Sequence, residues 1–321
     1  MKKDLNYYIK RFTQLRVDRA HGQAPYQPLL LLSLIELIEQ GTIKENHFPI
    51  TPELISTFIK YRDRLSSTFH QANPAQPFYH MSRPSQAFWH LVPIPGHEQV
   101  LFSGGKLNTL KKLRDNVLFG YFDQELFHIL QEPDKRQILM AELVKKWFPD
   151  KFSQIQQLLQ INSFQEFRYS LHEKGGAVYT VEELSKEDEV ETFRRDATFR
   201  KEILSLYDHR CAFCQLRIIS EDGQNIVDGS HILPFSTFRD DRFDNGLSLC
   251  KNHHWAFDHG WFGISDDYKI ILPEKRIREE PAVDSKPMLD FHGEYLFLPT
   301  QEEFHPRREA IQWHRERWKI A

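Results

Sequence analysis

Three cysteines and a histidine in the last third of this sequence have the spacing of metal ligands. Cys211 and Cys214 form a CxxC pair, and Cys250 and His253 repeat the same two-residue gap. Three thiolates and one imidazole complete a closed tetrahedral zinc site, which contributes folding energy rather than chemistry. The simpler alternative is three unpaired core cysteines, because free cysteine is commonly buried. Soft ligands at all four positions favour structural Zn²⁺, and the odd number of cysteines disfavours a disulfide framework.

Three further residues are interleaved with these ligands. His231 lies in VDGSHILPF, Asn245 lies in DNGLSL, and His254 directly follows the predicted zinc histidine. A lone histidine before an Ile-Leu-Pro segment is more often structural. The order and spacing of all three residues, however, resemble the HNH nuclease family, in which a β-hairpin carries the first histidine and a following helix carries the last. The resemblance covers about residues 192 to 320.

The resemblance implies a ββα-metal endonuclease domain in which each residue has one role. Phosphodiester hydrolysis needs a base for the attacking water and a cation beside the scissile phosphate. His231 would be the general base, since histidine exchanges protons near neutral pH. Asn245 would hold the hairpin of His231 through a side-chain to backbone hydrogen bond, and His254 would bind the catalytic divalent ion. Asp258 lies four residues after His254, on the same helical face, and is a second candidate ligand.

One position departs from the family pattern. Many members have an aspartate ligand just before the general-base histidine, where this sequence has Ser230. Asp258 is the favoured replacement on spacing, and Asp228 is the alternative. A site with more carboxylate would favour Mg²⁺, whereas a site with more imidazole would favour Mn²⁺ or another transition metal. The neighbouring His259 and Asp244 are more simply explained as exposed polar residues.

Apolar periodicity predicts an α+β chain whose front part is rich in helices. YQPLLLLSLIELIEQG should form a buried core helix, with Pro28 in its first turn and Gly41 after its end. Further helices are expected from Pro52 to about Ser66 and in KLNTLKKLRDNV, FDQELFHIL and PDKRQILMAELVKKWF. QPFYHM and AFWHLVPI have the composition of two short strands, because they are rich in aromatic residues and bounded by Pro and Gly.

The pattern along the chain predicts two domains joined by a linker. Residues 1–150 would be a DNA-recognition domain, residues 151–190 a linker with an acidic run, and residues 191–321 the nuclease domain. A helix in ETFRRDATFRKEILSLYDHR should lead into the first CxxC. The closing helix carries basic residues that could contact phosphates, although a solvated face is the simpler explanation: Arg307, Arg308, Arg315, Arg317 and Lys319.

Charge is unevenly distributed along the sequence. The net charge is −3, yet residues 1–120 contain fifteen Lys and Arg against nine Asp and Glu. Such asymmetry suits a front module that binds a polyanion such as double-stranded DNA, although a mild surplus is often only a solvated surface. No apolar run is long enough for a membrane span, and the segment MKKDLNYYIKRF lacks the apolar core of a signal peptide. The expected location is therefore the cytoplasm, with no membrane partner.

Two strings in the front part, AHGQAPYQPLLLLSLIELIEQGTI and ANPAQPFYHMSRPSQAFWHL, resemble the sulfur-binding domain found ahead of HNH modules in McrA-like restriction enzymes. Those domains recognise phosphorothioate-linked DNA with an apolar pocket that contains a proline ring and is flanked by basic and amide groups. The resemblance covers about residues 5–148. It implies a DNA-binding set made of a pocket loop and its rim: Gln76, Pro77 and Phe78 in the loop, and Arg19, His21, Gln23, His80 and Arg83 at the rim. An aromatic residue is expected where Gln76 stands, so methylated cytosine or unmodified duplex remain alternative targets.

Together these features predict a modification-dependent DNA endonuclease of a restriction system, with one structural zinc and one catalytic Mg²⁺ or Mn²⁺. One alternative is an HNH nuclease with another recognition task in a different defence system. The other is a non-catalytic zinc module that only binds DNA, and the joint presence of His231, Asn245 and His254 argues against it. One active site per chain suggests a homodimer for cutting both strands, although sequential nicking would also serve.

Overall fold

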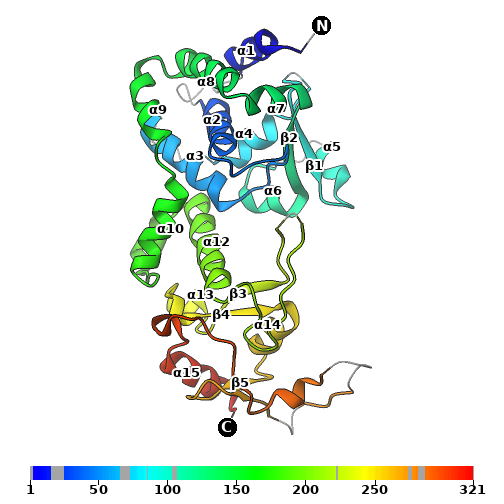
Figure 1. Cartoon of the computed structure of the whole chain (residues 1–321), viewed down its shortest axis with the longest axis vertical. Helices are drawn as coiled ribbons and strands as arrows, with labels where there is room; N and C mark the ends of the chain where they lie inside the picture. Colours follow the sequence, from blue (N-terminus) through cyan, green and yellow to red (C-terminus); the bar gives the residue numbers. More distant parts are fainter. Residues whose placement is uncertain are drawn as a thin grey trace. The chain divides into compact units, whose positions relative to one another are not determined.

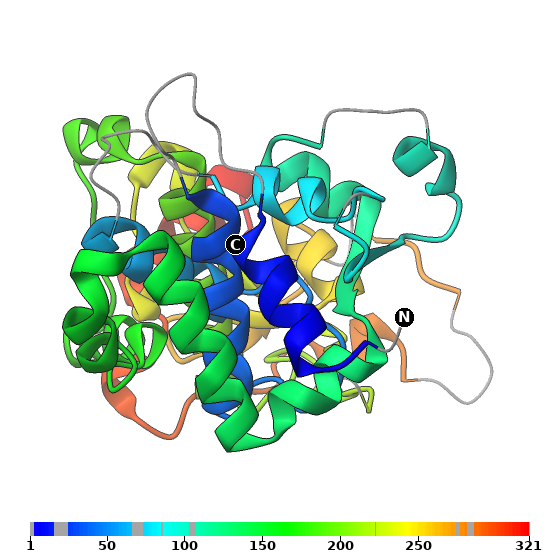
Figure 2. The same ribbon diagram turned by 90° about the horizontal axis from the view of Figure 1, so that it is seen from above.

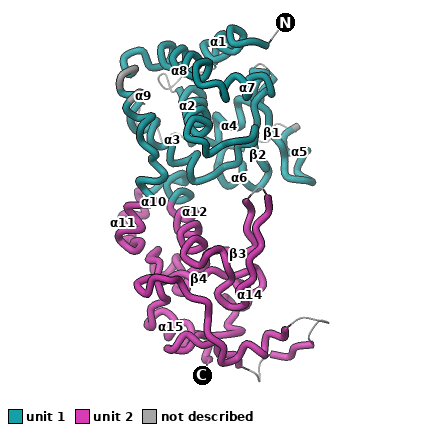
Figure 3. Tube along the Cα trace, in the orientation of Figure 1, with its two compact units in different colours: residues 1–167, 187–194 teal, residues 168–186, 195–321 magenta. Residues whose placement is uncertain are grey.

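The computed structural model describes residues 3–15, 25–65, 73–84, 86–102, 107–221, 223–273, 277–280 and 286–320 (Figure 1). The chain divides into two compact units (Figure 3). Unit 1 comprises residues 1–167 and 187–194, and unit 2 comprises residues 168–186 and 195–321. Helices dominate unit 1, whereas unit 2 combines helices with short antiparallel strands. This mixture of helices and small sheets confirms the α+β class at its coarse level.

Unit 1 is built around α2 (Tyr26–Glu39), which was predicted as a core helix. Every residue of α2 from Gln27 to Ile38 is buried. The helices α3 (Pro52–Leu65), α4 (Ala75–His80), α7 (Gln124–Gln131) and α8 (Pro133–Trp147) pack against it, and α1 (Leu5–Thr13) lies beside α8 (Figure 2). Gly41 follows the helix with a φ of +69°, a conformation that glycine adopts without steric cost. The predicted helix and its end are therefore confirmed.

The interior of unit 1 contains the ion pair of Lys60 and Glu36, whose side chains are both buried. Lys60 Nζ lies 2.6 Å from Glu36 Oε1, and the Lys60 ammonium also donates to the carbonyl oxygens of Leu158 and Ile161. Because a buried charge without partners is costly, these three acceptors compensate for the loss of water around the ammonium. The pair thereby joins α2 and α3 to the end of α9 (Phe152–Leu158).

The two strands predicted in unit 1 have different outcomes. AFWHLVPI contains β1 (Trp89–Pro93), as expected, but QPFYHM lies in the helix α4. The strand prediction was wrong because Ala75, Phe78 and Met81 are all buried at helical spacing, and the Asn73 side chain accepts from Ala75 N at 2.9 Å to begin the turn.

The partner of β1 is a strand that the sequence analysis left unassigned. β2 (Val117–Phe122) directly follows α6 (Leu110–Asn116) and pairs antiparallel with β1, with Trp89 opposite Phe122. A Cβ on Gly120 would lie 2.1 Å from the Trp89 ring, so only glycine permits this close contact. Unit 1 also contains α5 (Glu98–Phe102) and the 3-10 turn η1 (Pro149–Lys151).

Segment 151–190, predicted as a linker, contains helices in the structure. They are α9, α10 (Ser163–Glu173) and α11 (Val181–Lys186), and the two units divide this segment between them. The predicted helix before the first CxxC is α12 (Glu189–Leu206). No helix in the described parts of the chain has both the length and the apolar character that crossing a bilayer requires.

Unit 2 contains a two-stranded ribbon followed directly by a helix. β3 (Val227–His231) pairs antiparallel with β4 (Gly246–Cys250), so that His231 lies opposite Gly246 and Cys250 lies opposite Val227. The helix α14 (Lys251–Asp258) begins immediately after β4. A Cβ on Gly246 would lie 2.2 Å from Ile203 of α12, which shows how closely α12 packs on the ribbon. This β-β-α order is the one that the sequence predicted for the nuclease part.

The rest of unit 2 surrounds this ribbon and helix. A second ribbon is formed by β5 (Gly263–Ile264) and β6 (Ile270–Ile271), and the closing helix α15 (Arg308–Trp318) packs against β5. The remaining short elements are α13 (Phe235–Phe238), η2 (Phe243–Asn245), η4 (Met288–Phe291) and η5 (Glu302–Phe304).

Candidate active site and metal centre

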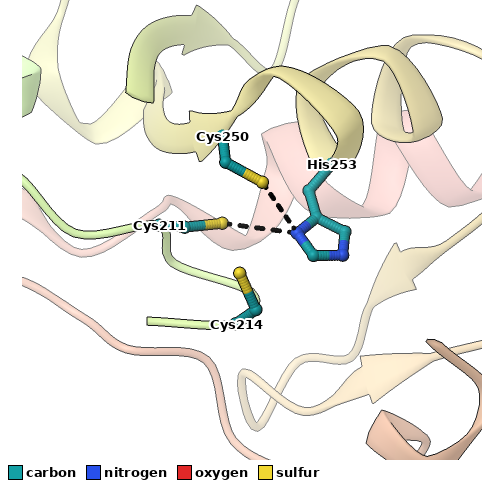
Figure 4. Close-up of side chains that lie close together, drawn as sticks. All are labelled: Cys211, Cys214, Cys250 and His253. Carbon is teal, nitrogen blue, oxygen red and sulfur yellow. Dashed lines mark hydrogen bonds between the residues drawn. The ribbon is translucent and has the colours of Figure 1, made fainter. Parts of the chain in front are cut away.

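The four predicted zinc ligands converge in unit 2. Cys211 and Cys214 flank a tight turn in which Gln215 N donates to Cys211 O at 2.8 Å, and Cys250 ends β4 just before His253. The four ligand atoms all lie within 4.8 Å of one another (Figure 4). His253 Nδ1 is 3.1 Å from Cys250 Sγ and 3.6 Å from Cys211 Sγ. Since zinc takes such ligands at about 2.0–2.3 Å in a tetrahedron, the cluster could hold one zinc ion.

The groups of this cluster share protons unequally, because hydrogen bonds with Cys214 and Cys250 together with burial raise the pKa of the Cys211 thiol. All three cysteines are free, and Cys211 and Cys250 are buried. Hydrogen bonds from Cys211 and Cys214 lower the pKa of the Cys250 thiol. Burial lowers the pKa of His253, but hydrogen bonds and charge from Cys214 and Cys250 outweigh burial and raise it to about 9. A cation in the cluster would replace the protons that these groups share.

His231 stands at the end of β3 in a fixed orientation. Its ring stacks on Phe199 of α12 at 3.9 Å between centroids and 1° between planes. Its Nε2 lies 2.7 Å from Asp241 Oδ1, and the other oxygen of the Asp241 carboxylate accepts from Arg195 at 2.8 Å. Because an ionised carboxylate only accepts, Nε2 carries the proton and Nδ1 keeps its lone pair. The geometry therefore leaves Nδ1 of His231 as its basic nitrogen.

Asp241 was not singled out in the sequence. It is 4% exposed and belongs to the loop between β3 and β4, ten residues after His231. The only sequence signal is the carboxylate pair Asp240–Asp241 in RDDRFDNG. Nothing in that string distinguishes a residue that orients histidine from an exposed acidic one, because the contact depends on how the loop folds back.

Asn245 determines how this loop folds. Its side chain is fully buried and makes three hydrogen bonds to backbone atoms. Oδ1 accepts from Leu233 N at 2.9 Å, while Nδ2 donates to Leu233 O at 3.2 Å and to Asp240 O at 2.9 Å. The amide thus holds together the chain just after His231 and the chain just before Asp241.

His254 on α14 lies between the two carboxylates considered as metal ligands. Its Nε2 is 3.5 Å from Asp258 Oδ2, and its Nδ1 is 3.8 Å from Asp228 Oδ2. Asp228 is already engaged: the nearby His254 imidazole and then the Lys251 ammonium lower its pKa to about 2, against the opposing effect of burial. The Asp258 side chain is 53% exposed, so it is the more accessible of the two carboxylates.

A cavity of about 310 Å³ brings the predicted catalytic groups together. Its lining includes His231 from β3, His254 and Asp258 from α14, and Arg317 from α15. Asn245 and Asp228 do not line it. Ser230, at the position where the family has aspartate, lines the cavity and is 2% exposed. The imidazoles of His231 and His254 and the carboxylate of Asp258 therefore share one space.

The comparison with protein families agrees with this geometry. Residues 211–265 match the family model described as HNH endonuclease. These residues form an HNH endonuclease domain. The matched segment contains both the cysteine cluster and the residues His231, Asn245, His254 and Asp258.

One solved structure is similar to part of this chain. A solved structure of a modification-dependent TagI restriction endonuclease matches at 24% sequence identity with a TM-score of 0.29. The match covers 38% of this chain and 37% of that chain, so the chain spans well under half the length of that neighbour. No curated protein matches the sequence.

Two residues near the HNH domain's site have other partners. His259 stacks on Trp255 at 4.1 Å and its Nδ1 lies 2.7 Å from Trp255 O. Asp244 accepts from Arg307 at 2.6 Å, and Arg307 also pairs with Asp240. Arg307 is therefore part of an ion-pair network and not of a solvated face.

The predicted recognition residues of unit 1 are only partly within the structure. Arg19, His21 and Gln23 lie outside the described residues. Pro77 is buried in α4, and Phe78 is fully buried with its ring 5.0 Å from that of Trp89. The Phe78 ring is therefore part of the core and does not form the wall of an open pocket.

Three residues of the predicted DNA-binding set, one from the pocket loop and two from the rim, remain on or near the surface. Gln76 and Arg83 are exposed. His80 is half-buried, and burial together with the charge of Arg83 lowers its pKa. These three side chains are the described part of the predicted DNA-binding set that a ligand can reach.

Proposed function

We propose that this protein is a metal-dependent DNA endonuclease that hydrolyses phosphodiester bonds in modified DNA as part of a restriction system. The observation that carries the proposal is the cavity shared by His231, His254 and Asp258. The match of the surrounding segment to HNH endonucleases supports it. A zinc module that only binds DNA would not need a histidine such as His231, which the buried Asp241 carboxylate orients.

The residues of the cavity suggest how hydrolysis proceeds. Asp241 holds the Nε2 proton of His231, so Nδ1 accepts a proton from the attacking water. Asn245 keeps the loop of Asp241 in place through its bonds to Leu233 and Asp240. Stacking on Phe199 prevents the His231 ring from turning away. The proton acceptor is therefore positioned before substrate binds.

We assign the catalytic divalent ion, Mg²⁺ or Mn²⁺, to His254 and Asp258. An imidazole nitrogen and a carboxylate oxygen 3.5 Å apart are close enough that both could bind one ion. When bound, such an ion polarises the phosphate and stabilises the leaving oxygen. The separate cluster of Cys211, Cys214, Cys250 and His253 would hold a structural Zn²⁺.

The choice between Asp258 and Asp228 is testable by metal titration. His254→Ala and Asp258→Ala should each raise the Mg²⁺ or Mn²⁺ concentration needed for half-maximal cleavage by about tenfold or more, since each removes one ligand. Asp228→Ala should change it less, because Asp228 is tied to Lys251. The measurement is plasmid cleavage across a metal series. The reverse order of effects would make Asp228 the ligand.

DNA recognition is assigned to unit 1. The surplus of positive charge in residues 1–120 and the sequence resemblance of residues 5–148 to sulfur-binding domains support this assignment. Phosphate contacts would give salt-sensitive binding to any duplex. Preference for phosphorothioate would need an apolar contact for the weakly hydrated sulfur, close to Pro77 and the exposed Gln76.

Digestion of matched plasmids tests the recognition part of the proposal. The plasmids are unmodified, phosphorothioated or cytosine-methylated, and each is incubated with Mg²⁺ and with Mn²⁺. We expect the phosphorothioated plasmid to be cut fastest. Nicked circles that precede linear DNA would indicate sequential cuts, whereas direct linearisation would favour a homodimer. Preference for the methylated plasmid, or equal cutting of all three, would reject recognition of sulfur.

A further inference from the structure

The closing helix α15 is fixed against α14, which carries His254 and Asp258. His314 stacks on Phe257 at 3.8 Å and 3°, and His314 Nε2 donates to Phe257 O at 2.9 Å. A Cβ on Gly260, just after α14, would lie 2.4 Å from Trp318, so the chain there is in direct contact with the end of α15. Side chains of α15 are therefore held at defined positions around the cavity of His231.

Arg317 is the arginine of α15 that lines this cavity. Its guanidinium lies 5.2 Å from the ring centre of Trp313 and 5.6 Å from that of Trp318. Trp313 is itself held by Phe238, whose ring centre is 5.1 Å away. Contacts with two indole rings restrict the guanidinium without neutralising its charge. Arg317 is thus a positive group that is oriented and still exposed.

The other arginines near this helix are used within the protein. Arg307 pairs with Asp240 and Asp244, and Arg315 donates to Ile264 O and Asp266. Among the residues that the structure describes, Arg317 forms neither a hydrogen bond nor an ion pair. Its five N–H donors are therefore available to a ligand.

Two buried polar atoms on the cavity lining also lack partners. The hydroxyl of Ser230 and Nδ1 of His314 are buried and have no hydrogen-bond partner in the described structure. Because His314 Nε2 donates to a carbonyl, Nδ1 can only accept, whereas the Ser230 hydroxyl can donate to an oxygen. A ligand oxygen in the cavity would accept from the Ser230 hydroxyl and so satisfy a group that is otherwise unpaired.

We propose that Arg317 binds the phosphate of the substrate in the His231 cavity, with Trp313 and Trp318 holding its guanidinium in position. The inference rests on the proposed nuclease function. A guanidinium matches two phosphate oxygens with two parallel hydrogen bonds, which an ammonium does not. Arg317 would place the scissile phosphate between His231 and the ion-binding pair His254–Asp258, and would stabilise the negative charge that develops on it.

The test compares Arg317→Ala and Arg317→Lys with Arg308→Ala, an exposed arginine of the same helix that does not line the cavity. Arg317→Ala should lower kcat/KM for plasmid cleavage by about tenfold to a hundredfold, the loss of a charge-assisted hydrogen bond. Arg317→Lys should recover part of the loss, and Arg308→Ala should cleave as the unaltered protein does.

DNA binding provides a second readout that does not depend on cleavage. In a His231→Ala background, the affinity for duplex is measured from low to moderate salt. Arg317→Ala should reduce the slope of log affinity against log salt by about 0.9, corresponding to one phosphate contact, and Arg308→Ala should leave it unchanged. If the unaltered protein binds duplex but never cuts it, the nuclease proposal is rejected. The difference in salt slope then still shows whether Arg317 contacts a phosphate. Equal slopes and equal kcat/KM for Arg317→Ala and Arg308→Ala would overturn the inference.

Discussion

Replacing His231 by alanine should reduce cleavage by at least about a hundredfold, the usual contribution of a general base. Among the described residues that line the cavity, only His231 has a ring that both stacks on an aromatic side chain and bonds to a buried carboxylate. The substitution removes the proton acceptor without disturbing the cysteine cluster. Zinc content and duplex affinity should therefore stay unchanged. The measurement is single-turnover cleavage of a plasmid at saturating divalent ion.

Two further variants test whether the loss is specific to His231 and depends on its orientation. His259→Ala removes an exposed histidine of the same domain that lies outside the cavity, and it should cleave normally. Asp241→Asn should give an intermediate loss. The asparagine has one carbonyl oxygen and cannot accept from both His231 and Arg195 as the carboxylate does, so the orientation of His231 is weakened. A His231→Ala protein that cuts like the unaltered one would eliminate His231 as the base.

Replacing Cys211 or Cys250 by serine should unfold unit 2 and release its metal. Zinc bound to such clusters contributes about 10–16 kcal/mol at neutral pH, which is comparable with the whole stability of a typical domain. Both cysteines are in the hydrophobic core of unit 2, so loss of the ion also exposes that core. We expect about one zinc per chain in the unaltered protein and none in either variant, with loss of the cooperative thermal transition of unit 2.

Asn252→Ala is the matched control for the cysteine variants. Asn252 is exposed and lies between two ligands, Cys250 and His253, in the first turn of α14. It should retain both metal and fold. Elemental analysis and circular dichroism distinguish the outcomes, and a folded, active Cys211→Ser protein without zinc would refute the structural role of the cluster.

The sequence predicted which candidate residues of the HNH domain lie together, because their proximity depends on local spacing. The two-residue gaps place Cys211 near Cys214 and Cys250 near His253 whatever the remaining fold, and four residues along α14 place Asp258 beside His254. Asp241 could not be found in the same way. Its contact with His231 spans a loop whose path depends on the buried amide of Asn245, and no short pattern encodes that path.

In unit 1 the predictions of secondary structure were wrong where local composition and tertiary packing favour different structures. Aromatic residues around Phe78 indicated a strand, but burial of Ala75, Phe78 and Met81 at helical spacing outweighed that local preference. The same packing removes the Phe78 ring from the surface where a recognition pocket was expected. The strand β2 was missed because its aromatic residues stand directly between two strongly helical segments.

The role of the closing helix could not be judged from the sequence either. Five basic residues of the closing segment were all more simply explained as a solvated face. In the structure these residues differ: Arg307 and Arg315 have carboxylate partners, whereas Arg317 lines the cavity and contacts two indole rings. Only the packing of α15 on α14 distinguishes these residues.

We propose that the His231 cavity is a nuclease site and that a divalent ion activates it. This ion is not the zinc of the cysteine cluster. The most direct measurement is cleavage of supercoiled plasmid by protein that retains one zinc per chain and has been freed of all other divalent ions. We expect no cleavage until Mg²⁺ or Mn²⁺ is added, then cleavage by the unaltered protein and not by His231→Ala, with the zinc content constant throughout. Cleavage at full rate before the second ion is added, or equal cleavage by His231→Ala, would contradict the claim.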